Sequence, residues 1–206
     1  AMSNICWAFA KLDYKAAELF EAVAGQHKLI ARSSNVQAMS NICWAFAKLE
    51  CNADALFGAV ARQHKRIAKS DNVQAMSNIC WAFAKLDYKA AELFEAVAGQ
   101  HKLIAGSGNV QNMSNICWAF AKLECNADAL FEAVAGEYER IAESGNVQAM
   151  SNICWAFAKL ECKAAELFEA VAGQHKLIVK SGNVQAMSDI CSAFAKAGHK
   201  AEALFE

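Results

Sequence analysis

The sequence predicts an all-α fold, a right-handed α-solenoid built from 37-residue helix-turn-helix repeats, each of them an antiparallel pair of helices. Three observations predict it. The string Asn-Ile-Cys recurs without drift from residues 4, 41, 78, 115 and 152, and Asp-Ile-Cys continues the series from residue 189. A fixed period in this range is typical of solenoids. Apolar residues recur with helical spacing inside each unit, and none of the 206 residues is a proline.

The period divides the chain into one repeat array over residues 1–206 and not into separate domains. Partial repeats at 1–34 and 183–206 flank the repeats 35–71, 72–108, 109–145 and 146–182. Because both ends cut through a repeat, we expect the array to be a piece of a longer one.

Composition excludes several classes of protein. Apolar residues make up 56% of the chain but form no long uninterrupted stretch, which argues against disorder and against membrane insertion. Twenty basic and twenty-one acidic residues leave a net charge of −1, so the whole molecule does not attract nucleic acid or an anionic membrane. Any such attraction must come from charges that are segregated on the surface.

Nine cysteines occupy two repeat positions. One series comprises Cys6, Cys43, Cys80, Cys117, Cys154 and Cys191, and the other Cys51, Cys125 and Cys162. Equivalent atoms in stacked helices lie about 8 to 10 Å apart, whereas a disulfide requires Cα atoms closer than about 7 Å. We therefore expect reduced core thiols, no metal site, and a reducing intracellular compartment.

The repeat at 72–108 predicts two helices. The first spans 72–86, with Asn72 as its N-cap. The second spans 90–105, and in alternate repeats Asn52 or Asn126 is available as its cap. Gly106-Ser107-Gly108 ends the unit.

A helical wheel at 100° per residue divides both helices into two faces. In the first helix the core arc holds Met76, Ile79, Cys80, Phe83 and Leu86, while the opposite arc holds Gln74, Ser77, Asn78, Trp81 and Lys85, with Ala75 and Ala82 beside them. The core arc of the second helix holds Leu93, Phe94, Val97, His101 and Ile104. Stacked repeats would join these arcs into one continuous core.

The first helix resembles the signature of octotricopeptide repeat proteins. Residues 74–86 read Gln-Ala-Met-Ser-Asn-Ile-Cys-Trp-Ala-Phe-Ala-Lys-Leu, and the family pattern is Gln-x-Leu-Ala-Asn-x-x-Trp-Ala-x-Ala-Lys-Leu. The resemblance covers the whole chain and extends to heptatricopeptide and pentatricopeptide repeats. It implies binding of single-stranded RNA in a chloroplast or mitochondrion, in RNA metabolism or in the assembly of ribosomes and other complexes. The period of 37 rather than 38 and the absence of proline depart from the family pattern.

Charge placement independently favours RNA. The first helices carry one lysine each, and Asp189 is their single acid, so the rest of the chain holds 14 basic and 20 acidic residues. A row of lysines suits a groove that follows a nucleic-acid strand, although a lysine in the last turn also complements the helix dipole. The row comprises Lys11, Lys48, Lys85, Lys122, Lys159 and Lys196.

Amide side chains share that face and are candidate contacts to bases, because amides both donate and accept hydrogen bonds. An alternative is a ladder of hydrogen bonds between neighbouring helices, and the sequence favours neither. The set comprises Gln37, Gln74, Gln111, Gln148 and Gln185 with Asn4, Asn41, Asn78, Asn115, Asn152 and Asp189.

Two aromatic series are interpreted as packing residues. The tryptophans at 7, 44, 81, 118 and 155 could stack on bases, but Ser192 replaces them in the last repeat, which favours packing between helices. The histidines at 27, 64, 101 and 175 have no neighbouring ligand series, and Tyr138 replaces one of them. No enzyme motif or cofactor-binding motif is found, so we expect neither catalysis nor a cofactor.

The leading hypothesis is a modular single-stranded RNA binder that reads about one base per repeat and prefers a homopolymeric tract. The alternative is a tetratricopeptide-like scaffold that binds proteins within a larger assembly. The near-identity of the repeats would also suit a consensus design.

Overall fold

The computed structural model describes residues 2–33 and 35–199, and these residues form helices and no strands. The chain divides into two compact units, residues 1–100 and 101–206. The first unit contains α1 (Met2–Lys11), α2 (Ala17–Gly25), α3 (His27–Arg32), α4 (Val36–Lys48), α5 (Asp54–Ala61), α6 (His64–Ala68), α7 (Val73–Lys85) and α8 (Ala91–Ala98). The second contains α9 (His101–Gly106), α10 (Val110–Lys122), α11 (Asp128–Ala135), α12 (Tyr138–Glu143), α13 (Val147–Lys159), α14 (Ala165–Ala172), α15 (His175–Lys180) and α16 (Val184–Ala197).

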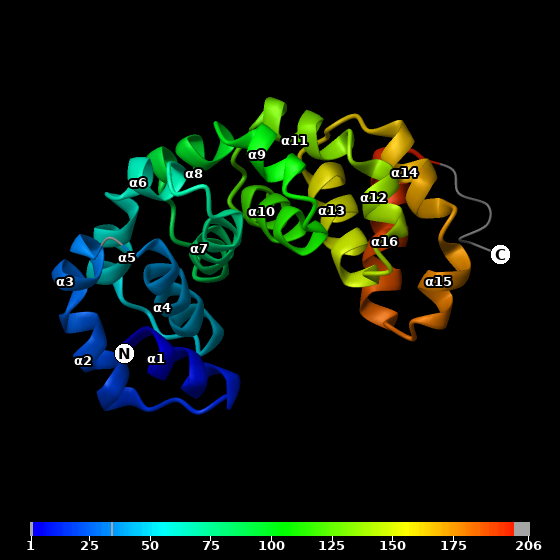
Figure 1. Ribbon diagram of the computed structural model, residues 1–206. Helices are drawn as coiled ribbons and strands as arrows, with labels where there is room; N and C mark the ends of the chain where they lie inside the picture. Colours follow the sequence, from blue (N-terminus) through cyan, green and yellow to red (C-terminus); the bar gives the residue numbers. More distant parts are fainter. Residues whose placement is uncertain (1, 34, 200–206) are drawn as a thin grey trace. The chain divides into compact units, whose positions relative to one another are not determined.

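Each unit has two layers (Figure 1). One layer holds the long helices: α4 packs against α1 and α7 in the first unit, and α13 packs against α10 and α16 in the second. The other layer holds the short helices, where α3 packs on α5, α6 on α8, α9 on α11, and α12 on α14. This arrangement confirms the predicted all-α helical-repeat fold.

The core lies between the two layers and repeats with the sequence. Met76, Ile79, Cys80 and Phe83 are fully buried in α7, as the wheel predicted. In α4, α7, α13 and α16 a phenylalanine of the long helix meets one from the short-helix layer of the preceding repeat. Their ring centroids are 4.8 to 4.9 Å apart and steeply inclined, a favourable aromatic geometry. The pairs are Phe20–Phe46, Phe57–Phe83, Phe131–Phe157 and Phe168–Phe194.

The prediction of a single second helix is wrong, because the segment 90–105 is divided into α8 and α9. At the break the amide of Gln100 donates to the carbonyl of Val97 at 2.9 Å, a tighter turn than the α-helix allows. Apolar spacing continues across the break from Val97 to His101 and Ile104, so the wheel could not detect it. The rings of His27 and His64 bridge the equivalent breaks through Nδ1, which donates to the carbonyls of residues 24 and 61.

The predicted caps are half correct. The asparagine before each full-length long helix caps it, with its side-chain oxygen accepting a backbone N–H at 2.8 to 3.0 Å. The prediction that Asn52 and Asn126 cap the second helices is wrong, since Ala53 and Ala127 occupy the N-cap position without a side-chain hydrogen bond. Asp54 and Asp128 lie in the first turn instead, where a negative charge complements the helix dipole.

The polar arc of the long helices is narrower than predicted. Ser77, Ala75 and Ala82 are fully buried, not exposed beside Gln74. The reason is that a long helix has neighbours of its own kind on its flanks, as α4 has α1 and α7. Small side chains at these positions allow the helices to approach closely.

An acidic residue follows the last turn of the long helices α1, α4, α7, α10 and α13 in a strained conformation. Glu161 has φ 57°, and the next amide, of Cys162, donates to the carbonyl of Phe157 at 2.9 Å. This is the Schellman arrangement, in which glycine is the preferred residue. The equivalent acids Asp13, Glu50, Asp87 and Glu124 also have positive φ.

We predict that Glu161→Gly raises the free energy of unfolding by about 1 kcal/mol, because it relieves a left-handed conformation. Glu124→Gly should give a smaller gain, since it also removes an ion pair with Lys159 that is worth about 0.2 to 1 kcal/mol at an exposed site. Urea denaturation followed by circular dichroism measures both. A loss of stability in Glu161→Gly would contradict the proposed strain.

Candidate functional site

The predicted site residues lie on one narrow band of each long helix, which we call the exposed stripe. In α4 the stripe consists of Gln37, Asn41, Trp44 and Lys48, spaced so that they follow one side of the helix. The same spacing recurs in α7, α10 and α13, and in α16 with Asp189 and Ser192 at the second and third positions. Position and register are therefore as predicted, and RNA binding by these residues remains a prediction.

The amides of the stripe are hydrogen-bonded within the protein. Gln37 donates through Nε2 to Asn41 Oδ1 at 2.9 Å, and its Oε1 accepts a bond of 3.0 Å from Asn72 Nδ2, which belongs to the next repeat. The second unit repeats this network, from Asn146 to Gln111 and from Gln111 to Asn115, both at 2.9 Å. Bonds between repeats thus use the capping asparagine, a residue that the sequence identified only as a cap.

Asp189 fits the same network. Gln185 donates to its Oδ1 at 2.9 Å, as Gln148 donates to Asn152 Oδ1 at 3.0 Å. An acceptor is the group that this position supplies to the protein, so aspartate replaces asparagine there without loss of the bond.

Acidic residues accompany the lysines of the stripe. Lys85 Nζ lies 3.0 Å from Glu50 Oε1, and Lys48 Nζ lies 3.6 Å from Asp13 Oδ1. In the second unit Lys159 Nζ lies 3.2 Å from Glu124. Each partner is the left-handed acid that ends the preceding long helix, 35 residues earlier in the chain. Sequence reasoning missed these acids as site residues, although an acid follows Leu12, Leu49, Leu86, Leu123 and Leu160.

The tryptophans pack between successive long helices in the first unit. The ring centroids of Trp44 and Trp81 are 6.4 Å apart, which confirms the predicted packing there. Lys11 Nζ lies over both Trp7 and Trp44, at 5.3 and 5.4 Å from their centroids. This distance is typical of a cation–π contact. The rings remain partly exposed, and Trp7 is 44% exposed.

The cysteines are free thiols, as predicted. Burial raises the pKa of Cys43 and of Cys154 to about 12, and it also raises the pKa of Cys117. Such thiols are poor nucleophiles because the thiolate is the reactive form. Within the described residues no group of three or more histidine, cysteine or acidic side chains is arranged to hold a metal ion.

We predict that iodoacetamide at pH 8 labels the partly exposed Cys51 and Cys162 well before Cys43 and Cys154. The raised pKa values keep the buried thiols protonated at this pH, so their labelling should accelerate as the pH increases. Peptide mass spectrometry after a time course measures the order. Equally fast labelling of all four residues in the folded protein would contradict the packing of the long helices.

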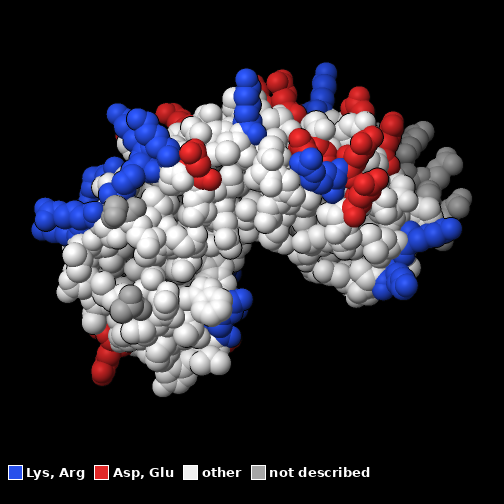
Figure 2. All heavy atoms as spheres, viewed as in Figure 1, with Lys and Arg blue, Asp and Glu red and all other residues white. Residues whose placement is uncertain are grey.

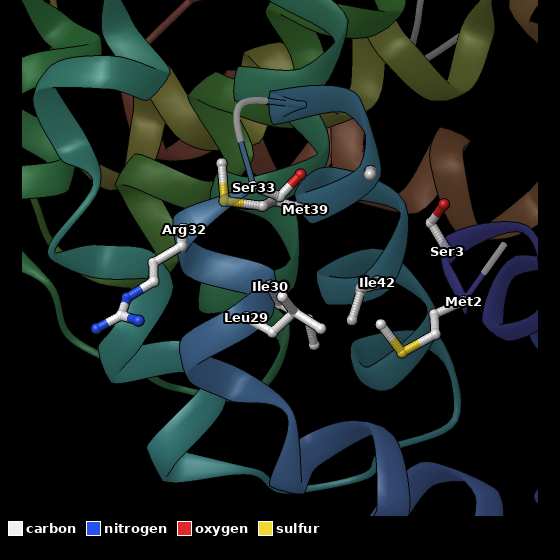
Figure 3. Close-up of a pocket in the computed structure, with 9 residues that line it drawn as sticks. Met2, Ser3, Leu29, Ile30, Arg32, Ser33, Met39 and Ile42 are labelled. Atoms are coloured by element: carbon white, nitrogen blue, oxygen red, sulfur yellow. The ribbon is translucent and has the colours of Figure 1, made fainter.

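An apolar hollow of about 410 Å³ lies between α1, α3 and α4. Figure 3 shows Met2, Leu29, Ile30 and Ile42 directed into it, whereas Arg32 points away. One repeat later the residues equivalent to Met2, Ile30 and Ile42 are fully buried. There Arg66 replaces Leu29 and reaches the carbonyl of Ala31 and the sulfur of Met39. The hollow is therefore lined by residues that, at equivalent positions one repeat later, pack between neighbouring repeats.

Comparison with known families identifies the group to which this repeat array belongs. The model of the RNA-editing substrate-binding complex 6 protein family matches residues 1–206. The chain belongs to this family. A comparison with curated proteins gives no match. The family description is coarser than the octotricopeptide assignment, which remains a resemblance. No helix in the described residues is long and apolar enough to cross a bilayer.

We predict that Asn146→Ala lowers the free energy of unfolding by about 1 to 2 kcal/mol, through loss of the cap and of the bond to Gln111. Asn146→Asp retains a capping oxygen but cannot donate to Gln111 Oε1, so its stability should fall between those of wild type and Asn146→Ala. Thermal and urea denaturation of the three proteins measure this order. A variant Asn146→Asp as unstable as Asn146→Ala would show that the cap contributes nothing.

Proposed function

We propose that this chain binds single-stranded RNA through the exposed stripes of its long helices, as a subunit of an RNA-editing complex. The observation that carries the proposal is the recurrence of one set of glutamine, asparagine, tryptophan and lysine in the same register on successive helices. Membership of a family named for binding RNA-editing substrates supports it.

The amides of the stripe retain hydrogen-bond donors and acceptors that could bind bases. A side-chain amide can donate two hydrogen bonds and accept about two. Gln148 donates one bond to Asn152 and accepts one from Asn183, so internal bonding does not exhaust either group. Base edges would use the remaining donors and acceptors, and the exposed parts of the tryptophan rings would support stacking.

The lysines would contact phosphates only by exchanging partners. Lys48, Lys85 and Lys159 are ion-paired to acids that are themselves more than 70% exposed. Exposed ion pairs contribute at most about 1 kcal/mol, so a phosphate can replace the carboxylate. Six independent phosphate contacts would give a salt slope of about −4. Because the acids compete, we expect a shallower slope for this face.

We predict selective binding to one RNA homopolymer in fluorescence anisotropy with labelled strands of about ten nucleotides. Nearly identical stripes should read nearly the same base, so a tract of about five or six nucleotides should suffice. Replacing Gln111 and Gln148 by alanine should reduce the preference, and replacing Asn52 and Asn126, two exposed amides outside the stripes, by alanine is the matched control. Equal affinity for all four homopolymers would exclude base reading, and no binding at low salt would exclude the proposal.

A protein-binding scaffold is the second candidate, and the internal pairing of the stripe favours it. Amides and lysines that are already bonded to each other offer less attraction to a charged ligand than free ones. A scaffold would hold protein partners by contacts that depend little on salt, whereas RNA binding weakens steeply with salt. The free cysteines agree with a reducing compartment, and we assign the chain to an organelle on the resemblance of its long helices to organellar repeat proteins.

A further inference from the structure

Charge on the short-helix layer differs sharply between repeats. Residues 54–70 contain four basic side chains and one acid, Asp54, whereas the equivalent residues 128–144 contain five acids and one base, Arg140. Figure 2 shows a group of lysine and arginine side chains over the region of α3 and α6. The long helices carry no comparable difference, because their lysine recurs in every repeat.

Five cations in the first unit form a compact surface that we call the basic grid. Lys28 and Arg32 lie one helical turn apart on α3, and Lys65 and Lys69 occupy the same positions one repeat later. Arg62 extends the row at the end of α5. All five side chains are exposed. Neighbours along a helix are about 6 Å apart, and α3 packs on α5, which leads through Arg62 into α6.

A sixth cation, Arg66, connects the two short helices that carry the grid. The guanidinium of Arg66 turns inward, where Nη2 donates to the carbonyl of Ala31 at the end of α3 and contacts the sulfur of Met39. This bond crosses between repeats and fixes α6 beside α3. A positive charge at a helix C-terminus also complements the dipole.

The cations of the basic grid are not neutralised as the stripe lysines are. In the described part of the chain, none of the five forms an ion pair, whereas Lys48 and Lys85 in the same unit do. The acids of this layer are Glu18 and Glu21 on α2, Asp54 in the first turn of α5, Asp71 in the loop after α6, and Glu92 and Glu95 on α8, which packs on α6. The strongest uncompensated positive charge of the unit is thus on the short-helix layer.

The composition of the grid favours a nucleic-acid backbone over a protein surface. Protein interfaces are anchored by aromatic or apolar residues that become buried. Among the described residues of α3, α5 and α6, Leu29 alone is a large apolar side chain that is exposed, which is too little for such an anchor. Contacts to phosphates need only positive charge at intervals along a strand.

We propose that the basic grid binds the phosphate backbone of RNA independently of sequence, as a second contact besides the exposed stripes. The proposal rests on RNA being the ligand of this chain. Because the grid lies on the short-helix layer and the stripes on the long-helix layer (Figure 1), the two surfaces would bind different stretches of RNA.

The test compares three variants of the 206-residue chain in anisotropy titrations with a mixed-sequence RNA of about 20 nucleotides. The grid variant carries Lys28→Gln, Arg32→Gln, Arg62→Gln, Lys65→Gln and Lys69→Gln. A matched control changes three exposed lysines that lie outside the stripes and outside the repeat positions of the grid, namely Lys15, Lys89 and Lys163, to glutamine. A stripe variant changes the six stripe lysines to glutamine. Circular dichroism establishes that each variant is folded.

We expect the grid variant to bind RNA at least tenfold more weakly at low salt. The slope of log K against log salt concentration should become shallower by about 3.5, because five phosphate contacts at about 0.7 each are lost. The matched control should lose less than threefold. If the grid variant does not fold, the double variant Lys65→Glu and Lys69→Glu takes its place, with the same expected direction.

Two outcomes would contradict RNA binding by the basic grid while leaving RNA binding by the rest of the chain intact. One is unchanged affinity in the grid variant while the stripe variant loses binding. The other is displacement of RNA from the grid by polyglutamate at equal charge concentration, which would indicate an acidic protein as its partner. Failure of the wild-type chain to bind any RNA would instead remove the proposed function and the grid together.

Discussion

Side-by-side packing of the long helices is the contact on which the other features depend. α4 lies against α1 and α7, and α13 lies against α10 and α16. A helix with such neighbours and a core beneath it has only a narrow band left for solvent. Serines and alanines such as Ser40 and Ala45 are fully buried on its flanks, where a larger residue would force the helices apart. The exposed stripe is what remains, and the repeat period places it identically on each helix.

Most polar groups of the stripe are bonded to other groups of the same protein. Its glutamines and asparagines are joined by hydrogen bonds within and between repeats, and its lysines face carboxylates of the preceding repeat. Internal bonds of this kind orient the side chains, which lowers the entropy lost on binding. The ion pairs also weaken long-range attraction, because Lys48, Lys85 and Lys159 each have a carboxylate oxygen within 3.6 Å. A ligand of this face must therefore be recognised at short range, through hydrogen bonds and stacking.

The sequence predicted the fold and the stripe because both follow from periodicity. The 37-residue interval fixes which residues are equivalent, and helical spacing fixes which of them share a face. It could not predict the break before His101, since the apolar spacing of Val97, His101 and Ile104 continues across it. Nor could it predict the pairing of Lys85 with Glu50, which depends on a left-handed residue at the end of a helix and on the neighbour packed beside it.

Differences among repeats indicate that the two layers have different properties. Residues that must be the same for repeats to stack, such as Met76, Phe83 and the capping Asn72, belong to the core or to bonds between repeats. Lys65, Lys69 and their acidic counterparts Glu139 and Glu143 are exposed, so stacking does not depend on their identity. Opposite charges at these equivalent exposed positions give the repeats 35–71 and 109–145 different electrostatic surfaces on an unchanged scaffold. Under the proposed function, long-range attraction would come from the short-helix layer and short-range recognition from the long helices.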